Sequence, residues 1–220
     1  MSNLNQLLLS FEYEQNFKNL DFYVSKSNAH VFNLINNWSS QNEKFLNIIG
    51  EKFCGKSHLV NIFLEKNKGL RINSDRLNNY FLKKIRFYKN VILEDLTLRI
   101  NEKLFYSLIN IVEAENKHLI VTSNVSIVNL NFKLSDLKSR SKNFTLTSIE
   151  KPDDDLIFAL VLKNLSDRQI SINKKLIDYI IKRIDRSYSK ISNFVYKIDQ
   201  LSLKKKRSID FRIIKEALGD

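Results

Sequence analysis

The feature that most constrains this chain is the segment GEKFCGKS at residues 50–57, which holds two of the only four glycines in the sequence. It completes the pattern G-x-x-x-x-G-K-[ST], in which glycines allow backbone N–H groups to turn toward an anion at the start of a helix. The apolar run at residues 45–49 precedes it and is typical of a strand, whereas residues 59–64 suit a buried helix. Because strand, loop and helix follow in the order that the motif requires, the sequence predicts a phosphate-binding loop.

The residues of this loop have expected roles in holding a nucleotide. Lys56 would bring its charge to the β- and γ-phosphates, and the Ser57 hydroxyl would bind Mg²⁺. Cys54 would be a small residue that fills the loop. The alternative, a chance match within a tight turn, is disfavoured by the flanking strand and helix. We therefore expect ATP or ADP with Mg²⁺ to bind at Gly50, Cys54, Gly55, Lys56, Ser57 and His58.

Composition limits the class of protein. With 43% hydrophobic residues in 220, the chain can build the core of one α/β domain and a small satellite. A single cysteine excludes an internal disulfide framework. The longest apolar run, residues 156–162, is far shorter than the roughly 20 residues that cross a bilayer. The N-terminus also lacks the pattern of a secretory signal, so we expect a cytoplasmic protein without membrane contact.

The net charge of +12 raises the question of nucleic-acid binding, because basic surfaces bind phosphate backbones. Most of the positive charge is dispersed along the chain. The dense run at residues 204–207, KKKR, lies between two helical patterns and is expected to be a solvated loop rather than a DNA contact. A plain DNA-binding module stays an alternative, and steep salt dependence of duplex binding would mark it.

Short apolar runs alternate with helical patterns as far as about residue 148, as in a parallel sheet with crossover helices. From Pro152 onward only helical spacing is present. The predicted fold class is α/β, with a five-stranded parallel sheet followed by a small all-helical domain. The expected strands are residues 45–49, 70–73, 90–93, 119–122 and 144–147, and the expected units are an N-terminal peptide at 1–12, a nucleotide-binding domain at 13–149 and a helical lid at 150–220.

Two of the predicted strands end in polar residues suited to phosphate chemistry. The strand at 90–93 is followed by Glu94 and Asp95, and we expect Glu94 to hold Mg²⁺ and Asp95 to polarise the attacking water. The alternative is a pair of surface acids at a strand end. The next strand is followed by Asn124, which could orient water against the γ-phosphate.

Four segments together resemble, in order and spacing, the AAA+ module of the family of the bacterial replication initiator DnaA. They are GEKFCGKSHL, VILEDL, LIVTSN and, at residues 134–140, LSDLKSR. The segment DFYVSKSNA at residues 21–29 is similar to a family stretch whose loop packs on adenine. The resemblance implies an AAA+ fold, and it implies adenine contacts by Phe22 and Val24.

The chain is more similar to the short branch of this family, the regulatory inactivators of DnaA, because it ends at Asp220 just after the expected lid. Its N-terminus, QLLLSF at residues 6–11, is similar to peptides that dock on the sliding clamp, the beta subunit of DNA polymerase III. Gln6 would supply a polar anchor, and Leu7, Leu9 and Phe11 would fill an apolar pocket. An ordinary first strand or a hydrophobic tail is the alternative.

By this resemblance, Arg140 is an arginine finger that enters the active site of DnaA, and a surface salt bridge is its alternative role. The nucleotide-sensing residue of the lid is expected at Arg186 or Lys190, with a solvated helix face as the alternative. Glu94 replaces the usual Asp of the family. The implied partners are DnaA, the sliding clamp, DNA through the clamp, and further copies of the chain. A self-sufficient ATPase such as a helicase loader is the competing function.

Overall fold

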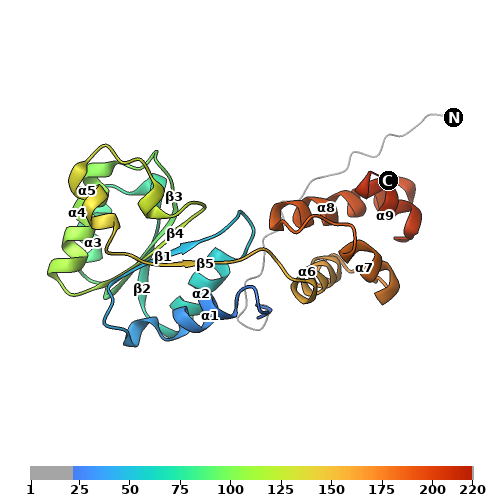
Figure 1. Ribbon diagram of the computed structural model, residues 1–220, viewed down its shortest axis with the longest axis horizontal. Helices are drawn as coiled ribbons and strands as arrows, with labels where there is room; N and C mark the ends of the chain where they lie inside the picture. The colour runs from blue at the N-terminus through green and yellow to red at the C-terminus, as the bar shows by residue number, and fades with distance from the viewer. Residues whose placement is uncertain (1–21, 220) are drawn as a thin grey trace.

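The computed structural model describes residues 22–219, and Figure 1 shows two domains along the long axis of the molecule. One is a sheet covered by helices, and the other is a group of four helices that we call the lid. The expected clamp-docking residues Gln6, Leu7, Leu9 and Phe11 lie outside the described residues. Among residues 22–219, no helix is both long and apolar enough to cross a membrane.

The sheet has five strands, all parallel, in the order β2-β3-β4-β1-β5. The predicted five-stranded parallel sheet is therefore confirmed. The strands are β1 (Phe45–Ile49), β2 (Gly69–Asn73), β3 (Asn90–Leu96), β4 (His118–Ser123) and β5 (Thr145–Ser148). Strand β3 continues three residues beyond its expected end, through a register irregularity between Leu93 and Leu96.

Helices cover both faces of this sheet. Successive side chains of a strand point to opposite faces, so each strand contributes to both cores. Val91 and Leu93 of β3 belong to one hydrophobic cluster, and Ile92 between them belongs to the other. The first face is covered by α3 (Asn79–Ile85), α4 (Glu102–Ala114) and α5 (Ser135–Ser141), and the second by α1 (Ala29–Asn36) and α2 (Lys56–Lys66). The central strands β1, β3 and β4 are thus buried on both faces, which explains why they are nearly continuous apolar runs.

The lid consists of α6 (Asp154–Ser166), α7 (Lys174–Ile181), α8 (Tyr188–Lys205) and α9 (Phe211–Leu218), which share a hydrophobic cluster of their own. Helix α6 begins behind Pro152 with Asp153 as its cap, because the Asp153 carboxylate accepts the N–H of Leu156. The last helix begins at Phe211, since Asp210 caps it. One expectation is corrected here. The run at 204–207 is exposed, but its first two lysines complete α8 rather than a loop.

Candidate functional site

The predicted phosphate loop lies between the end of β1 and the start of α2, on the side of the sheet domain that faces the lid (Figure 1). Gly50 donates its N–H to the carbonyl of Ser123 at 3.1 Å, and a Cβ on Gly50 would lie 2.4 Å from the Cys54 sulfur. Gly55 has a φ of 97°, and Phe53 also has a positive φ, of 70°. These left-handed positions turn the backbone around the start of α2, which is the geometry of an anion-binding nest.

Lys56 is the buried cation of this loop, with only 7% of its surface exposed. Its ammonium donates to the carbonyl oxygens of Gly50 at 2.7 Å and Glu51 at 2.9 Å. It also donates to the amide oxygen of Asn124, at 3.2 Å, beyond the end of β4. The structure thus brings together two residues that the sequence assigned to the site separately. A buried ammonium surrounded by neutral oxygens is a strong point charge for phosphate.

The two acids at the end of β3 have different environments. Glu94 is only 5% exposed and forms an ion pair with Arg71 of β2 through one carboxylate oxygen. The other oxygen, Oε1, has no hydrogen-bond partner among the described residues. Asp95 is exposed and has a left-handed φ of 54°. Its N–H donates to the Thr122 hydroxyl at 3.1 Å.

One feature of this arrangement, the Glu94 oxygen that has no partner among the described residues, suits a magnesium ion. A buried carboxylate oxygen without a partner is costly, and a divalent cation or a water would satisfy it. Ser57 is half-buried in the first turn of α2, so Ser57 and Glu94 are the residues that would hold the metal. Among the described residues, no group of three His, Cys, Asp or Glu side chains forms a metal-binding cluster.

Aromatic rings surround the other side of the loop. Phe22 stacks on Phe32 with ring centroids 5.6 Å apart, and it meets the His58 ring edge-on at 5.2 Å. A Cβ on Gly55 would lie 3.2 Å from the Phe22 ring, so this aromatic group touches the phosphate loop directly. Val24 lies nearby in sequence and is exposed. Phe22 and His58 are therefore brought together with the loop.

The lid contacts the loop through Glu51, which the sequence analysis did not identify. Its carboxylate accepts the Ser187 hydroxyl and the N–H groups of Tyr188 and Ser189, each N–H at 3.2 Å. Burial raises the pKa of Glu51, but these hydrogen bonds outweigh burial and hold the pKa below its ordinary value. The Tyr188 hydroxyl also donates to the carbonyl of Glu150 at 3.0 Å. The first turn of α8 is thus fixed to the phosphate loop.

Two curated relatives are both chromosomal replication initiator proteins DnaA. The protein of Lachnoclostridium phytofermentans is 24% identical in an alignment 198 residues long, which covers 79% of this chain and 44% of that protein. The protein of Buchnera aphidicola is 21% identical in an alignment 240 residues long, gaps included, which covers 97% of this chain and 55% of that protein. The chain spans about half the length of the curated relatives it matches. No protein-family model matches it.

Solved structures agree on the fold. Domain III of DnaA from Thermotoga maritima has a TM-score of 0.75 at 16% identity and covers 93% of this chain, with 96% of that domain covered. The chain therefore has the fold of DnaA domain III. DnaA bound to AMPPCP and single-stranded DNA has a TM-score of 0.66 at 17% identity, over 85% of this chain and 67% of that one. The RuvB branch migration motor of Thermotoga maritima has a TM-score of 0.65 at 14% identity, over 89% of this chain and 69% of that one.

Arg140 lies on α5 of the sheet domain. It pairs with Glu113 of α4, and its guanidinium carbon lies 5.7 Å from the centre of the Tyr106 ring. In Figure 1, α4 and α5 lie at the end of the sheet domain that is remote from the lid and from the phosphate loop. Arg140 is therefore not brought to the nucleotide site of its own chain.

Neither expected lid sensor is brought to the loop by a contact of its own side chain. Arg186 pairs with Asp154 at 2.7 Å, and Lys190 pairs with Asp185. All four side chains in these pairs are more than half exposed. The residues between them, including Ser187, contact Glu51 instead. The start of α8 is thus at the site, whereas the two cations point to solvent.

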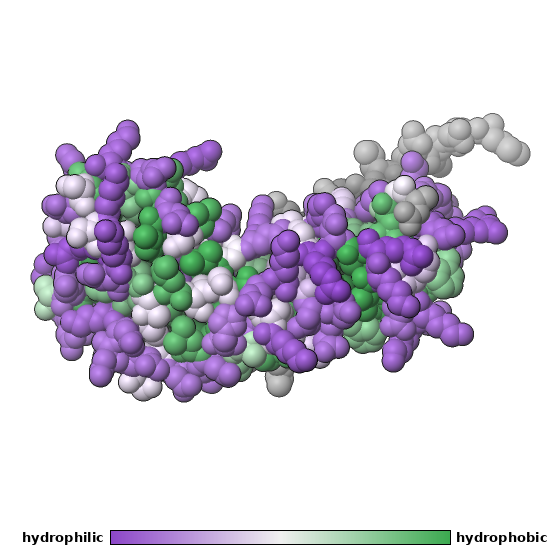
Figure 2. Space-filling model, viewed as in Figure 1, coloured by the Kyte–Doolittle hydropathy of each residue, from purple (hydrophilic) through white to green (hydrophobic). Residues whose placement is uncertain are grey.

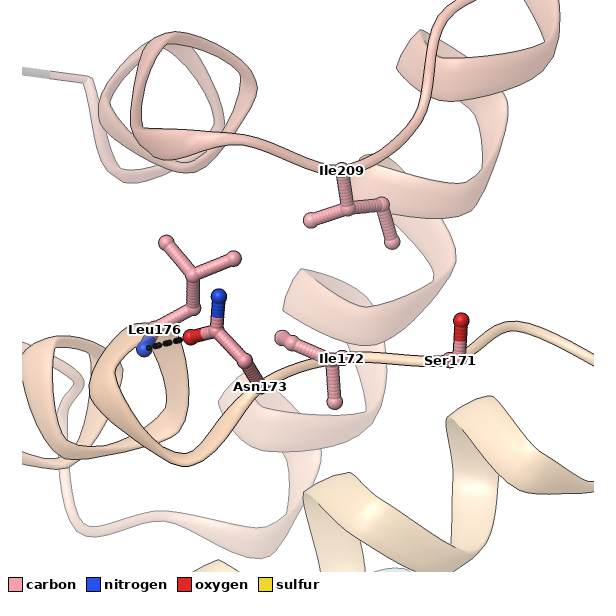
Figure 3. A pocket seen from close by; sticks show the side chains of 5 residues that line it. All are labelled: Ser171, Ile172, Asn173, Leu176 and Ile209. Carbon is pink, nitrogen blue, oxygen red and sulfur yellow. Dashed lines mark hydrogen bonds between the residues drawn. The ribbon is translucent and has the colours of Figure 1, made fainter.

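The lid also contains a pocket of about 340 Å³, seen from close by in Figure 3. The amide oxygen of Asn173 accepts the N–H of Leu176 at 3.0 Å and so caps α7. The pocket has no charged side chain that could bind phosphate, and it does not include the phosphate loop. It is lined by Ser171, Ile172, Asn173, Leu176 and Ile209.

Proposed function

We propose that this chain is an adenine-nucleotide-binding AAA+ regulator of replication initiation, of the type of the regulatory inactivators of DnaA. In this proposal it docks on the sliding clamp through residues 6–11 and stimulates ATP hydrolysis by DnaA through Arg140. DNA is reached mainly through the clamp. The bound nucleotide, ADP or ATP with Mg²⁺, acts chiefly as a structural switch inside the chain. The boundaries at residues 1–12, 13–149 and 150–220 separate the docking peptide, the nucleotide-binding domain and the lid.

Nucleotide binding is supported by the loop geometry. The buried Lys56 ammonium and the left-handed turn at Gly55 provide the charge and the backbone shape that phosphate requires. Phe22 and His58 supply aromatic surface beside the loop. DnaA structures with the same fold are bound to AMPPCP. When present, Mg²⁺ would screen the phosphate charges at Ser57 and Glu94.

Slow ATP hydrolysis by this chain alone is supported by the environments of Glu94 and Asp95. Glu94 is already paired with Arg71, and the backbone of Asp95 is fixed in a left-handed conformation. A self-sufficient ATPase such as a helicase loader would need both acids free to handle Mg²⁺ and water. Steady-state ATP hydrolysis without DnaA separates the two functions. Turnover comparable with that of an AAA+ motor would favour the loader.

The observation that carries the regulator function is the position of Arg140. It is partly exposed, oriented by Glu113 and Tyr106, and remote from the phosphate loop of its own chain (Figure 1). An arginine finger acts on a nucleotide held by another molecule, and where fingers have been measured they contribute about 10³ to 10⁵ in rate. A surface salt bridge contributes only about 0 to 1 kcal/mol, so the two roles differ widely in size.

Single-turnover hydrolysis by ATP-loaded DnaA, with clamp on DNA, tests this role. Arg140→Ala is expected to fold, bind ADP and the clamp, and lose the stimulation. Arg140→Lys should not restore it, because a point charge lacks the planar fork of guanidinium. Lys138→Ala, an exposed cation on the same helix, is the matched control and should stimulate normally. Undiminished stimulation by Arg140→Ala would refute the mechanism.

Clamp docking is tested separately from the fold. Deleting residues 1–11 should abolish co-elution with the clamp and leave ADP affinity unchanged. Leu9→Ala should weaken the complex, whereas Leu8→Ala should not, because the docking pattern leaves that position free. If the truncated protein still co-elutes with the clamp, residues 1–11 are not the docking peptide.

A second candidate function, direct binding of single-stranded DNA, is favoured by one surface around α3. Tyr80 and Phe87 are 66% and 85% exposed, and Figure 2 shows hydrophobic side chains among hydrophilic ones on the visible face of this domain. Exposed aromatic rings among cations are typical of surfaces on which bases stack. A DnaA structure with this fold holds single-stranded DNA. The exposed cations of the segment are Lys83, Arg86 and Lys89.

Fluorescence anisotropy with a labelled oligothymidine tests this surface. Each stacked base contributes about 1 to 3 kcal/mol, so Phe87→Ala should weaken binding about tenfold. The control is Tyr196→Ala, which removes an exposed aromatic ring from α8 of the lid. Binding by Phe87→Ala equal to that of the unmodified protein would refute the α3 surface, and an equal loss in both variants would place the DNA elsewhere.

A further inference from the structure

The strand-end acid Glu94 has a counter-charge that comes from the neighbouring strand. Arg71 lies on β2 opposite Ile92 of β3, so its side chain is on the face of the sheet that α2 covers. Its Nε pairs with Glu94, and its Nη1 donates to the amide oxygen of Asn61 on α2 at 2.7 Å. The guanidinium therefore bridges the acid to the helix that begins at the phosphate loop.

This pair changes the electrostatics of the site. Glu94 follows Ile92 by two positions and shares its face, so the carboxylate is on the side where α2 begins with Lys56. A buried carboxylate without a counter-charge would repel the phosphates of a nucleotide, and Mg²⁺ would be needed to bridge them. Arg71 supplies that compensation from within the protein. Only the Oε1 oxygen of Glu94, without a partner among the described residues, is left for a cation or a water.

We propose that Arg71 is a positioning residue that neutralises Glu94, so that the phosphate loop holds adenine nucleotide almost independently of Mg²⁺. The inference rests on the nucleotide binding proposed above. It deepens that function, because a regulator that uses its nucleotide as a structural switch must keep the nucleotide bound rather than turn it over. Arg71 thereby also restrains the carboxylate that would otherwise bind the metal through both oxygens.

The decisive measurement is the affinity for ADP by calorimetry, in excess Mg²⁺ and in EDTA, for the unmodified protein. We expect the two affinities to agree within about threefold, because the internal counter-charge is present in both conditions. A larger ratio would overturn the inference. Absence of ADP binding in both conditions would instead overturn the proposed function itself. This measurement needs no variant and is independent of folding defects.

Variants then assign the effect to the pair. Arg71→Gln should raise the ratio to about tenfold or more, since Glu94 is left as a bare charge. The double variant Arg71→Gln/Glu94→Gln should return the ratio to about threefold or less, which a merely structural role of Arg71 would not produce. Arg76→Gln, an exposed arginine just after β2, is the control. A ratio for Arg71→Gln equal to that of the control would refute the assignment.

Discussion

The sheet domain and the lid reach the phosphate loop in different ways. From the sheet, contacts come from strand ends whose spacing is fixed by register, such as the bond from Lys56 to Asn124 beyond β4. From the lid, the loop receives hydrogen bonds at the Glu51 carboxylate and at the Lys52 carbonyl, which accepts the Ser189 hydroxyl at 3.3 Å. The sheet contacts come from the ends of paired strands, whereas the lid contact joins two domains that each have a hydrophobic cluster, and Leu156 and Tyr188 of the lid also pack in a cluster of the sheet domain.

Part of the site is therefore rigid, and part of it can move. Residues at strand ends move only if the sheet moves, because the sheet is buried on both faces. The start of α8 can move with the lid only if its bonds to Glu51 and Lys52 break and Tyr188 leaves the cluster that it shares with the sheet domain. Nucleotide affinity should therefore depend mainly on the contacts from the strand ends. Transmission of the nucleotide state to partners should depend on the contacts from the lid.

The largest effect on ADP affinity is expected when the contacts of Lys56 with the strand ends are removed. Lys56→Ala removes a buried charge and three hydrogen bonds of the loop, and should lower ADP affinity about 10³-fold, the size of a close charge pair near a protein surface. Calorimetry with ADP measures this loss. The control is Lys52→Ala, which removes a lysine of the same loop that lies over the Phe53 ring. Equal ADP affinity in both variants would remove the phosphate-loop assignment.

A smaller effect tests whether the lid is held together by its own core. Ile180 is fully buried in the lid cluster, so Ile180→Ala should cost about 3 kcal/mol and loosen the lid. Hydrogen exchange should accelerate in α6 to α9 and stay slow in β1 and β4. The control is Ile181→Ala, because Ile181 is only partly buried. Equal acceleration in the sheet would show that the two domains open together.

The sequence predicted the parallel sheet well because the central strands β1, β3 and β4 are buried on both faces and form short apolar runs. It also predicted that Lys56 and Asn124 belong to one site, since the ends of parallel strands share one edge. The extension of β3 past Leu93 could not be predicted. Asp95 has a left-handed φ, its N–H donates to the Thr122 hydroxyl, and its carbonyl accepts the Ser74 hydroxyl; these long-range bonds have no local signature.

Long-range charge contacts were not predictable for a related reason. Arg71 and Glu94 are adjacent only because β2 and β3 pair, and an arginine in a strand is usually interpreted as an exposed polar position. Glu51 and Ser187 are 136 residues apart and meet only when the lid docks. Ser187 could have been identified as the cap of α8, but no local pattern indicates that its hydroxyl also donates to a carboxylate from the phosphate loop.

The smallest effect is expected when the contact between Glu51 and the lid is weakened. The Glu51 carboxylate accepts N–H groups at the start of α8, where a negative charge is favoured by the helix dipole. Glu51→Gln should therefore loosen the lid contact by about 1 kcal/mol. Hydrogen exchange at the first turn of α8 measures this, with Glu150→Gln as the control because the Glu150 carbonyl keeps its bond from the Tyr188 hydroxyl.

The same contact should depend on pH in a defined direction. The Glu51 pKa is held below its ordinary value of 4.5 in the folded protein, so its contribution to stability is fully present above about pH 4.5. That contribution is lost as the pH falls through the lowered pKa, because a protonated carboxyl no longer accepts three donors. Exchange at the start of α8 should accelerate below pH 4.5 relative to the centre of α8, and this acceleration should be absent in Glu51→Gln. If Glu51→Gln shows the same pH response, another group controls the docking of the lid on the loop.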